Sequence, residues 1–374
     1  MIDIKAIFAK QKALKIFTLA IFLLLLSIGL EWIANEVKGM SMLLPVLTKG
    51  TAYSLIAVSM NLLNGFTGLF SLGQAGFMLV GSYAYAILTI PVARRAGVYQ
   101  YYDGGIIQFS IPEIFSSFLG DYIGTTVGMC ITLVIAGLIA ALFAFLIGLP
   151  VLKLKSDYLA IATLGFAEII RTIIQFEGSA PLTNGSNTLR QYPTFDHLYA
   201  YVAVAAVCIG SIVLLVNSTY GRAFKAIRDD EIAAEAMGIN LARHKRMSFI
   251  ISSFYAGVGG GLMAMYMSSV QAKSFTSAMT YEILLIVVIG GVGSLSGSVL
   301  GTFLFVGCSE WWLRFLDDSN NNIAGLHILA PGFRMVVFSV VIMIIVLFFS
   351  KGIMGDKEIP YFIKRWKERK GMKK

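Results

Sequence analysis

The sequence YGRAFKAIRDDEIAAEAMGIN, residues 220–240, is the longest strongly polar insertion between two apolar segments that each look long enough to cross a bilayer. It predicts a short helix with both ends marked. Asp229 or Asp230 can cap the first exposed amides, and Glu231 adds negative charge in the first turn. Gly238 can adopt the left-handed conformation that stops a helix after Met237. One face is nearly all alanine, which suits a groove in another protein. A surface helix without a partner is the alternative.

The composition of the chain places it among membrane proteins. Hydrophobic residues make up 57% and charged residues 14% of its 374 residues, and the mean hydropathy is +0.77, whereas about a quarter of the residues in soluble domains are charged. The formal net charge of +9 would suggest nucleic acid in a soluble chain. Here Lys and Arg are concentrated in a few polar segments beside apolar ones. The sequence therefore predicts an all-α polytopic membrane protein that contacts lipid and not nucleic acid.

About ten segments are long and apolar enough to be transmembrane helices, since a spanning helix needs about 20 mainly apolar residues. We interpret the first segment as a retained helix and not a cleaved signal peptide, because Glu31 and Trp32 follow its apolar run and no small-residue cleavage site is evident. The predicted spans are residues 16–33, 43–63, 76–90, 124–149, 158–175, 198–216, 248–268, 281–292, 296–316 and 332–349.

The distribution of basic residues predicts the orientation of these spans, because cytoplasmic loops carry an excess of Lys and Arg. The amino-terminal tail carries four lysines before residue 16, and the tail 351–374 carries nine basic residues against three acids. Ten crossings place both tails inside, together with the basic loop 217–247. The acidic connections around Asp103, Asp196 and Asp317 then lie outside. We expect both termini to be cytoplasmic.

Two glycine-rich stretches, residues 64–76 and 290–297, interrupt the helical pattern. Non-helical backbone at membrane depth is tolerated where protein or water surrounds it, and paired interruptions in a transporter indicate the substrate path. Close helix packing is the alternative, and four-residue spacing favours it for Gly257, Gly261, Gly297 and Gly301. The residues predicted to line a translocation path are Asn64, Thr67, Ser71, Gln74, Glu168, Gly290 and Gly291.

Glu168 belongs to that set because ionisable residues inside a bilayer are costly and are functional candidates. It lies three residues before Arg171, so the two side chains can neutralise each other on one helix face. Alternatively, Arg171 extends to the membrane interface and the two residues form an ordinary structural pair.

The sequence contains no motif for nucleotide, metal or catalytic chemistry. There is no Gly-x-x-x-x-Gly-Lys-Ser/Thr phosphate loop, so any ATP must be used by a partner. The three cysteines each lie inside an apolar segment, and the three histidines are scattered over separate loops. We expect no metal, no cofactor and no enzymatic activity in this chain.

Two long motifs resemble those of ABC importer permeases. Residues 157–171 are similar to the signature of the LivM-type permeases of branched-chain amino acid importers, rather than of their LivH-type sister subunits. The polar loop resembles the coupling loop of the same family. Its matching residues are Gly221, Arg222, Ala226, Ile227, Arg228, Asp229, Asp230, Ala233, Ala234, Glu235, Ala236, Met237 and Gly238.

This resemblance implies a single permease domain, 1–374, in the bacterial inner membrane, which forms half of a translocation pathway for branched-chain, hydrophobic amino acids. It implies a second, LivH-type permease, two ATPase subunits of the LivG/LivF type that use the ATP, and a periplasmic or lipid-anchored binding protein. The residues that it assigns to ATPase coupling are Arg228, Asp229, Asp230, Glu231, Ala233, Ala234, Glu235, Met237 and Gly238.

Three alternatives stay open. The outer segment 182–187 departs from the family pattern, and related permeases of urea or short-amide importers have the same architecture. A channel or secondary transporter independent of an ATPase would keep the spans and broken helices, but would have no use for the capped alanine helix. A membrane enzyme would need a reacting constellation that the spans do not show.

Overall fold

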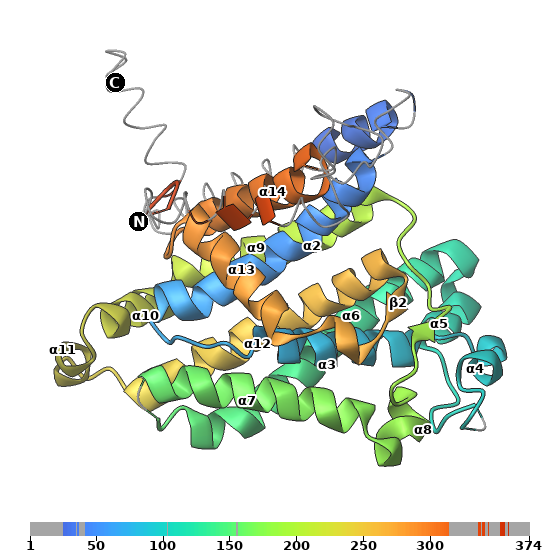
Figure 1. The fold of residues 1–374 in the computed structure, drawn as a ribbon, viewed down its shortest axis with the longest axis horizontal. Coiled ribbons are helices and arrows are strands. Elements are labelled where there is room, and N and C mark those ends of the chain that lie inside the picture. The colour runs from blue at the N-terminus through green and yellow to red at the C-terminus, as the bar shows by residue number, and fades with distance from the viewer. Residues whose placement is uncertain are drawn as a thin grey trace, which may run out of the picture.

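A computed structural model of the chain describes residues 25–34, 36, 42–102, 104–154, 156–313, 336, 337, 339, 340, 343, 352–355 and 358. These residues are mostly helical (Figure 1). The longer helices are α2 (Leu43–Asn61), α3 (Gln74–Thr89), α6 (Asp121–Val151), α7 (Ser156–Gln175), α9 (Leu198–Val216), α12 (Leu241–Met267), α13 (Ser277–Gly290) and α14 (Leu295–Glu310).

Shorter elements connect these helices. They are the π-helix η1 (Leu62–Phe66), α4 (Val92–Val98), α5 (Ile111–Leu119), the 3₁₀-helix η2 (Glu177–Ser179), α8 (Ala180–Thr183), α10 (Thr219–Asp229), α11 (Glu231–Ala236) and the 3₁₀-helix η3 (Ala272–Ser274). The strands β1 (Leu189–Arg190) and β2 (Ser269–Val270) pair in antiparallel fashion.

Five described helices are long and apolar enough to cross a membrane: Leu43–Phe66, Asp121–Val151, Tyr158–Gln175, Leu198–Val216 and Leu241–Met267. The predicted eighth and ninth spans form a pair, α13 and α14, bent by 118°, which would add a sixth. The predicted third span is present as α3, with 16 residues. Most of the predicted tenth span and half of the first lie outside the described residues, so the total of ten stays a prediction.

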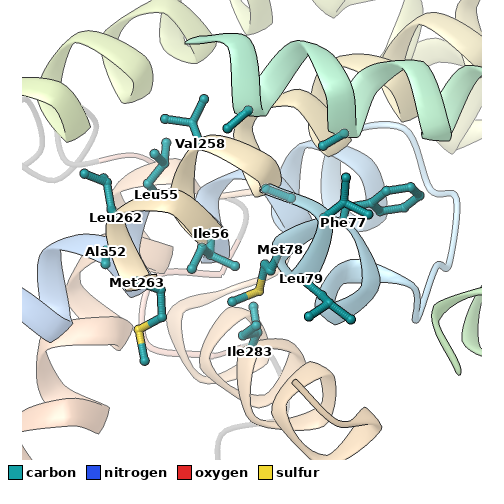
Figure 2. Close-up of a cluster of buried hydrophobic side chains, with 14 of the residues drawn as sticks. Ala52, Leu55, Ile56, Phe77, Met78, Leu79, Val258, Leu262, Met263 and Ile283 are labelled. Atoms are coloured by element: carbon teal, nitrogen blue, oxygen red, sulfur yellow. The ribbon is translucent and has the colours of Figure 1, made fainter. Parts of the chain in front are cut away.

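The core forms where α2, α3, α12 and α13 meet. Ile56 of α2, Met78 of α3, Leu262 of α12 and Ile283 of α13 are fully buried there (Figure 2). Of the 16 residues of α3, all but Leu88 are buried, so this helix runs through the centre of the described bundle. Apolar burial of this kind on every side of a helix is expected only when other helices surround it completely.

The glycines of α12 allow three helices to approach it closely. An added Cβ at Gly259 would lie 2.4 Å from Ile56 of α2, and one at Gly260 would lie 2.1 Å from the Met78 carbonyl oxygen of α3. At Gly257 and Gly261 it would lie 2.5 Å from side chains of α6. The predicted packing role of Gly257 and Gly261 is therefore confirmed, as small residues at membrane helix contacts would suggest.

The short helices gather at two opposite ends of the bundle. Figure 1 shows α10 and α11 at one end, and α4, α5 and α8 at the other. The second end is organised by Arg95, which is fully buried and donates to the carbonyls of Ile87, Ile107 and Phe109. The polar loop 217–247 and the segment 182–187 are thus on opposite ends of the molecule, as the predicted topology requires.

Candidate functional site

The polar loop begins with α10, whose apolar residues recur every three positions. Gly221, Phe224 and Ile227 are buried, whereas Arg222 is exposed. This pattern is typical of a helix that lies on a protein surface with one apolar stripe against it. α10 rests against α9, α12 and η1, so the base of the loop is anchored to the spans.

The helix α11 has the ends that the sequence predicts. The Asp230 carboxylate accepts hydrogen bonds from the backbone amides of Ile232 and Ala233, at 2.8 and 3.0 Å, and so caps the helix. Gly238 has a φ of +84° and follows the C-cap residue Met237. A left-handed residue at this position ends the helix without the strain that a Cβ would cause.

The exposed side of α11 differs in part from the predicted alanine face. Ala234 is buried against the protein, whereas Ile232 and Met237 are each 83% exposed. Ala233 and Ala236 are exposed as well, and positions 232, 233, 236 and 237 share one helix face. We call these four residues the α11 apolar face. Large exposed apolar side chains beside small ones are typical of a surface that binds a partner.

Ion pairs hold this loop in place. Lys245 of α12 contacts Glu231 at 2.6 Å, which connects the first turn of α11 to the start of α12. Asp229 contacts Arg228 at 3.0 Å, while Glu235 points outward as an exposed residue. Exposed pairs of this kind contribute about 0–1 kcal/mol each. Only the pair of Lys245 with Glu231 connects α11 to another helix, whereas the pair of Arg228 with Asp229 lies within α10.

Arg228 also connects the loop to the first glycine-rich break. Its Nη1 donates to the backbone carbonyl of Gly65 at 3.1 Å, and its aliphatic stem lies against Gly68. One turn earlier, the Lys225 ammonium lies 5.3 Å from the ring centre of Phe66. The last residues of α10 therefore lie directly on the broken end of α2.

The first break is a defined structure and not a loose linker. The helix α2 continues as η1, and the chain then runs without helix until α3 begins at Gln74. The Asn64 side chain bonds the backbone of Ser71 in both directions, at 3.2 and 3.4 Å, and Thr67 donates to the Leu62 carbonyl at 3.1 Å. The Gln74 amide donates to Ser59 at 2.6 Å. The four predicted path residues of this break thus stabilise it in the described conformation.

The second break lies between α13 and α14. Gly290 ends α13, and Gly291 has a φ of +117°. Ser294 caps α14 by accepting from the Gly297 amide at 3.1 Å. Added Cβ atoms at Gly297 and Gly301 would lie 2.3 and 2.9 Å from carbonyl oxygens of α13, which confirms their predicted packing role. Gly293, which shares their spacing, lies in the break itself.

The two breaks are joined by Asn61, a residue that the sequence analysis did not select. Asn61 is fully buried. Its Oδ1 accepts from the Gly293 amide at 2.8 Å, and its Nδ2 donates to the Ser294 carbonyl at 2.9 Å and the Ser298 hydroxyl at 2.7 Å. An added Cβ at Gly65 would lie 2.6 Å from the Gly293 nitrogen. We call Asn61, η1 and residues 291–294 the joined breaks.

Two other segments contact residues next to the joined breaks. Thr163 of α7 accepts from the Leu72 amide at 3.0 Å, so the signature segment 157–171 holds the first break. The Glu358 carboxylate of the tail accepts from the Leu295 and Ser296 amides at 2.8 and 3.1 Å. It therefore provides negative charge at the start of α14. This contact had no recognisable signal in the sequence.

Glu168 lies on α7 and not at the joined breaks. Its carboxylate contacts Arg171 at 2.5 Å, and both side chains are about one-third exposed. The predicted pairing on one helix face is confirmed. Six of the seven predicted path residues thus belong to the two breaks that Asn61 joins, whereas Glu168 lies apart from them.

The opposite end of the bundle holds a hollow of about 800 Å³. Glu31, Asp196, His197 and Tyr266 are among its lining residues, and the Glu31 carboxylate lies 2.7 Å from His197. At the same end, Tyr99 donates to the Leu182 carbonyl at 2.9 Å. Burial raises the pKa of Tyr99 to about 12.

The chain is similar to known permeases over most of its length. It is 30% identical to the high-affinity branched-chain amino acid transport system permease LivM of Salmonella typhimurium, over 84% of this chain and 72% of that protein. It is 30% identical to LivM of Escherichia coli, over 74% of this chain and 65% of that protein.

A shorter match, 30% identical over 29% of this chain and 33% of the relative, is to a probable branched-chain amino acid transport permease LivH of Methanocaldococcus jannaschii. No solved structure matches significantly. The family described as the permease component of branched-chain amino acid transport systems matches residues 42–348. The chain therefore belongs to this family of multi-pass membrane transport proteins.

Proposed function

We propose that this protein is the LivM-type permease subunit of an ATP-driven importer of branched-chain amino acids, and that α11 docks into an ATPase subunit. The observation that carries this proposal is the loop itself. A capped helix exposes an apolar face, and the base of the same loop is bonded to a broken transmembrane helix. A channel without an ATPase would have no use for this combination.

The orientation follows from the same loop. The positive-inside bias predicts that residues 217–247 face the cytoplasm, where the ATP is. We therefore propose that both termini are cytoplasmic and that the end with α4, α5 and α8 faces the periplasm. The hollow at Glu31 and His197 would then open toward a periplasmic or lipid-anchored binding protein. The ATP would be bound and hydrolysed by two LivG/LivF-type partners.

The second permease would complete the pathway. Only about a quarter of the residues of α7 and α9 are buried in the single chain, so the partly exposed faces of these helices are available to lipid or to a LivH-type subunit. The short homologous segment in a LivH relative supports a pair of related permeases. We propose that the joined breaks, with Asn64, Thr67, Ser71, Gln74, Gly290 and Gly291, form part of the gate between the two subunits. Irregular backbone at membrane depth is expected beside a path.

The test is co-purification of the tagged chain from its native membrane, followed by assays in proteoliposomes. We expect a second permease, two ATPases, and ATP hydrolysis stimulated by binding protein loaded with leucine, but not with urea. Ile232→Asp should lose the ATPases and keep the second permease, because it charges the α11 apolar face. Ile232→Leu, which keeps that face apolar, is the matched control. ATP-independent uptake by the chain alone would refute the proposal.

A further inference from the structure

We propose that Arg228 is a positioning residue that transmits the movement of the docked loop to the joined breaks. This inference rests on the proposed function and deepens it. It concerns the route by which closure of the ATPases reaches the path, and not the docking itself. The contact between Arg228 and Gly65 connects segments 163 residues apart in the chain.

The Arg228 guanidinium is bonded on two sides, to Asp229 and to η1. Nε and Nη2 contact one oxygen of Asp229 at 3.1 and 3.0 Å, and Nη1 donates to the Gly65 carbonyl at 3.1 Å. Asp229 thus orients the group while the opposite edge bonds the backbone of η1. Carbonyls at the end of a helix lack intrahelical partners, and a cation near them is favourable. Arg228 supplies both the missing donor and the charge at the end of α2.

The helix α10 lies very close to the non-helical segment that follows η1. Gly68 has a φ of +75°, and an added Cβ there would lie 3.0 to 3.3 Å from Cγ, Cα and Cβ of Arg228. The main chain of α10 is therefore in direct contact with the non-helical segment after η1. Lys225, over the ring of Phe66, repeats the contact one turn earlier on the same side of α10. A shift of α10 must move this segment with it.

The helix η1 is in turn connected to the second break. Gly65 lies against the Gly293 amide, and Asn61 bonds that amide and the Ser294 carbonyl. A displacement of η1 therefore pulls on residues 291–294, where α13 and α14 meet. This chain of contacts joins the ATPase-facing loop to both breaks through backbone atoms and one buried amide.

The experiment uses the complete importer in proteoliposomes, with leucine uptake and ATP hydrolysis measured in the same preparation. For Arg228→Ala we expect a complex with all its subunits, in which the amount of leucine moved per ATP falls by at least about fivefold, the lower end of typical coupling between sites. Arg228→Lys keeps a cation at the helix end and should recover part of the loss. Arg243→Ala, an exposed cation of the same loop, is the control and should keep the wild-type ratio.

A residue that only stabilises the fold would give a different result, because complex yield and thermal stability would fall while leucine per ATP stayed constant. That outcome would overturn the inference. Loss of the ATPases from Arg228→Ala would also overturn it, since Arg228 would then be a docking residue, yet the proposed function would survive. Absence of any ATPase from the wild-type complex would instead refute the proposed function.

Discussion

Replacing Asn61 with alanine should destabilise the joined breaks strongly, although the change removes only a small amide. The Gly293 amide loses its acceptor, and the Gly291 carbonyl, the Ser294 carbonyl and the Ser298 hydroxyl each lose a donor. Ser298 still donates to the Ser294 carbonyl and the Ser294 amide still donates to the Gly291 carbonyl, both at 3.1 Å, so these three groups keep a partner. The main loss is therefore at Gly293, whose amide lies among buried backbone atoms.

Two kinds of measurement give the expected loss of unfolding free energy for Asn61→Ala. A buried donor left without a partner costs about 1–3 kcal/mol in soluble proteins. Side-chain hydrogen bonds between membrane helices average about 0.6 kcal/mol, because the unfolded chain also finds partners in the membrane. Four lost bonds at the lower value, or one orphaned amide at the middle of the higher range, both give about 2 kcal/mol. We expect Asn61→Ala to lower the free energy of unfolding by that amount.

The measurement is reversible unfolding in mixed micelles with increasing dodecyl sulfate, followed by the loss of helical circular dichroism. Asn217→Ala is the matched control, because Asn217 is exposed and donates only to the Val213 carbonyl of its own helix. The free energy of unfolding of Asn217→Ala should differ from that of the wild type by less than about 0.5 kcal/mol. Equal stability of Asn61→Ala and Asn217→Ala would refute the account of the joined breaks.

Three further predictions concern the loop and the core. Asp230→Ala removes the cap of α11 and should cost about 1 kcal/mol locally, seen as faster hydrogen exchange at Ile232 and Ala233; unchanged exchange would contradict the assigned cap. Gly260→Val should prevent close packing of α12 on Met78 and abolish recovery of folded protein from the membrane, whereas normal recovery would disprove that contact. Glu235→Lys should insert normally but uncouple or disassemble the importer, and ATP-driven uptake at the wild-type rate would exclude a role for this exposed carboxylate.

Local features of the loop were predictable because their causes are local. The cap at Asp230 and the left-handed Gly238 each depend on residues within one helical turn, and both are present. The prediction of a free alanine face was only partly right. A helix of six residues must also rest on its own protein, and Ala234 is used for that contact. The alanine that is buried is decided by the packing of α11 against α10 and α12. The sequence of α11 alone does not contain this information.

The two breaks were predictable from their glycines, but the hydrogen bonds of Asn61 that join them were not. Asn61 lies 232 residues from Gly293, and it sits inside an apolar run that the sequence analysis treated as an ordinary span. A buried amide in such a run was the available signal, since polar groups in membrane helices need partners. The contact of Glu358 with α14 was equally hidden, because a carboxylate in a basic tail gives no indication of which helix it caps.

The close packing of the core explains why movement should concentrate at the joined breaks. The helices α2, α3 and α12 touch through glycines, and their interdigitated side chains leave little space for one to slide past another. Such a unit transmits a force as a rigid body. At η1 and residues 291–294, by contrast, side chains supply hydrogen bonds to the backbone carbonyls of Gly65 and Ser294 and to the Gly293 amide. Arg228, Asn61 and Glu358 each hold one side of this region. Under the proposed coupling, a movement of α11 would therefore reach the predicted path residues Asn64, Gly290 and Gly291 through Arg228 and Asn61.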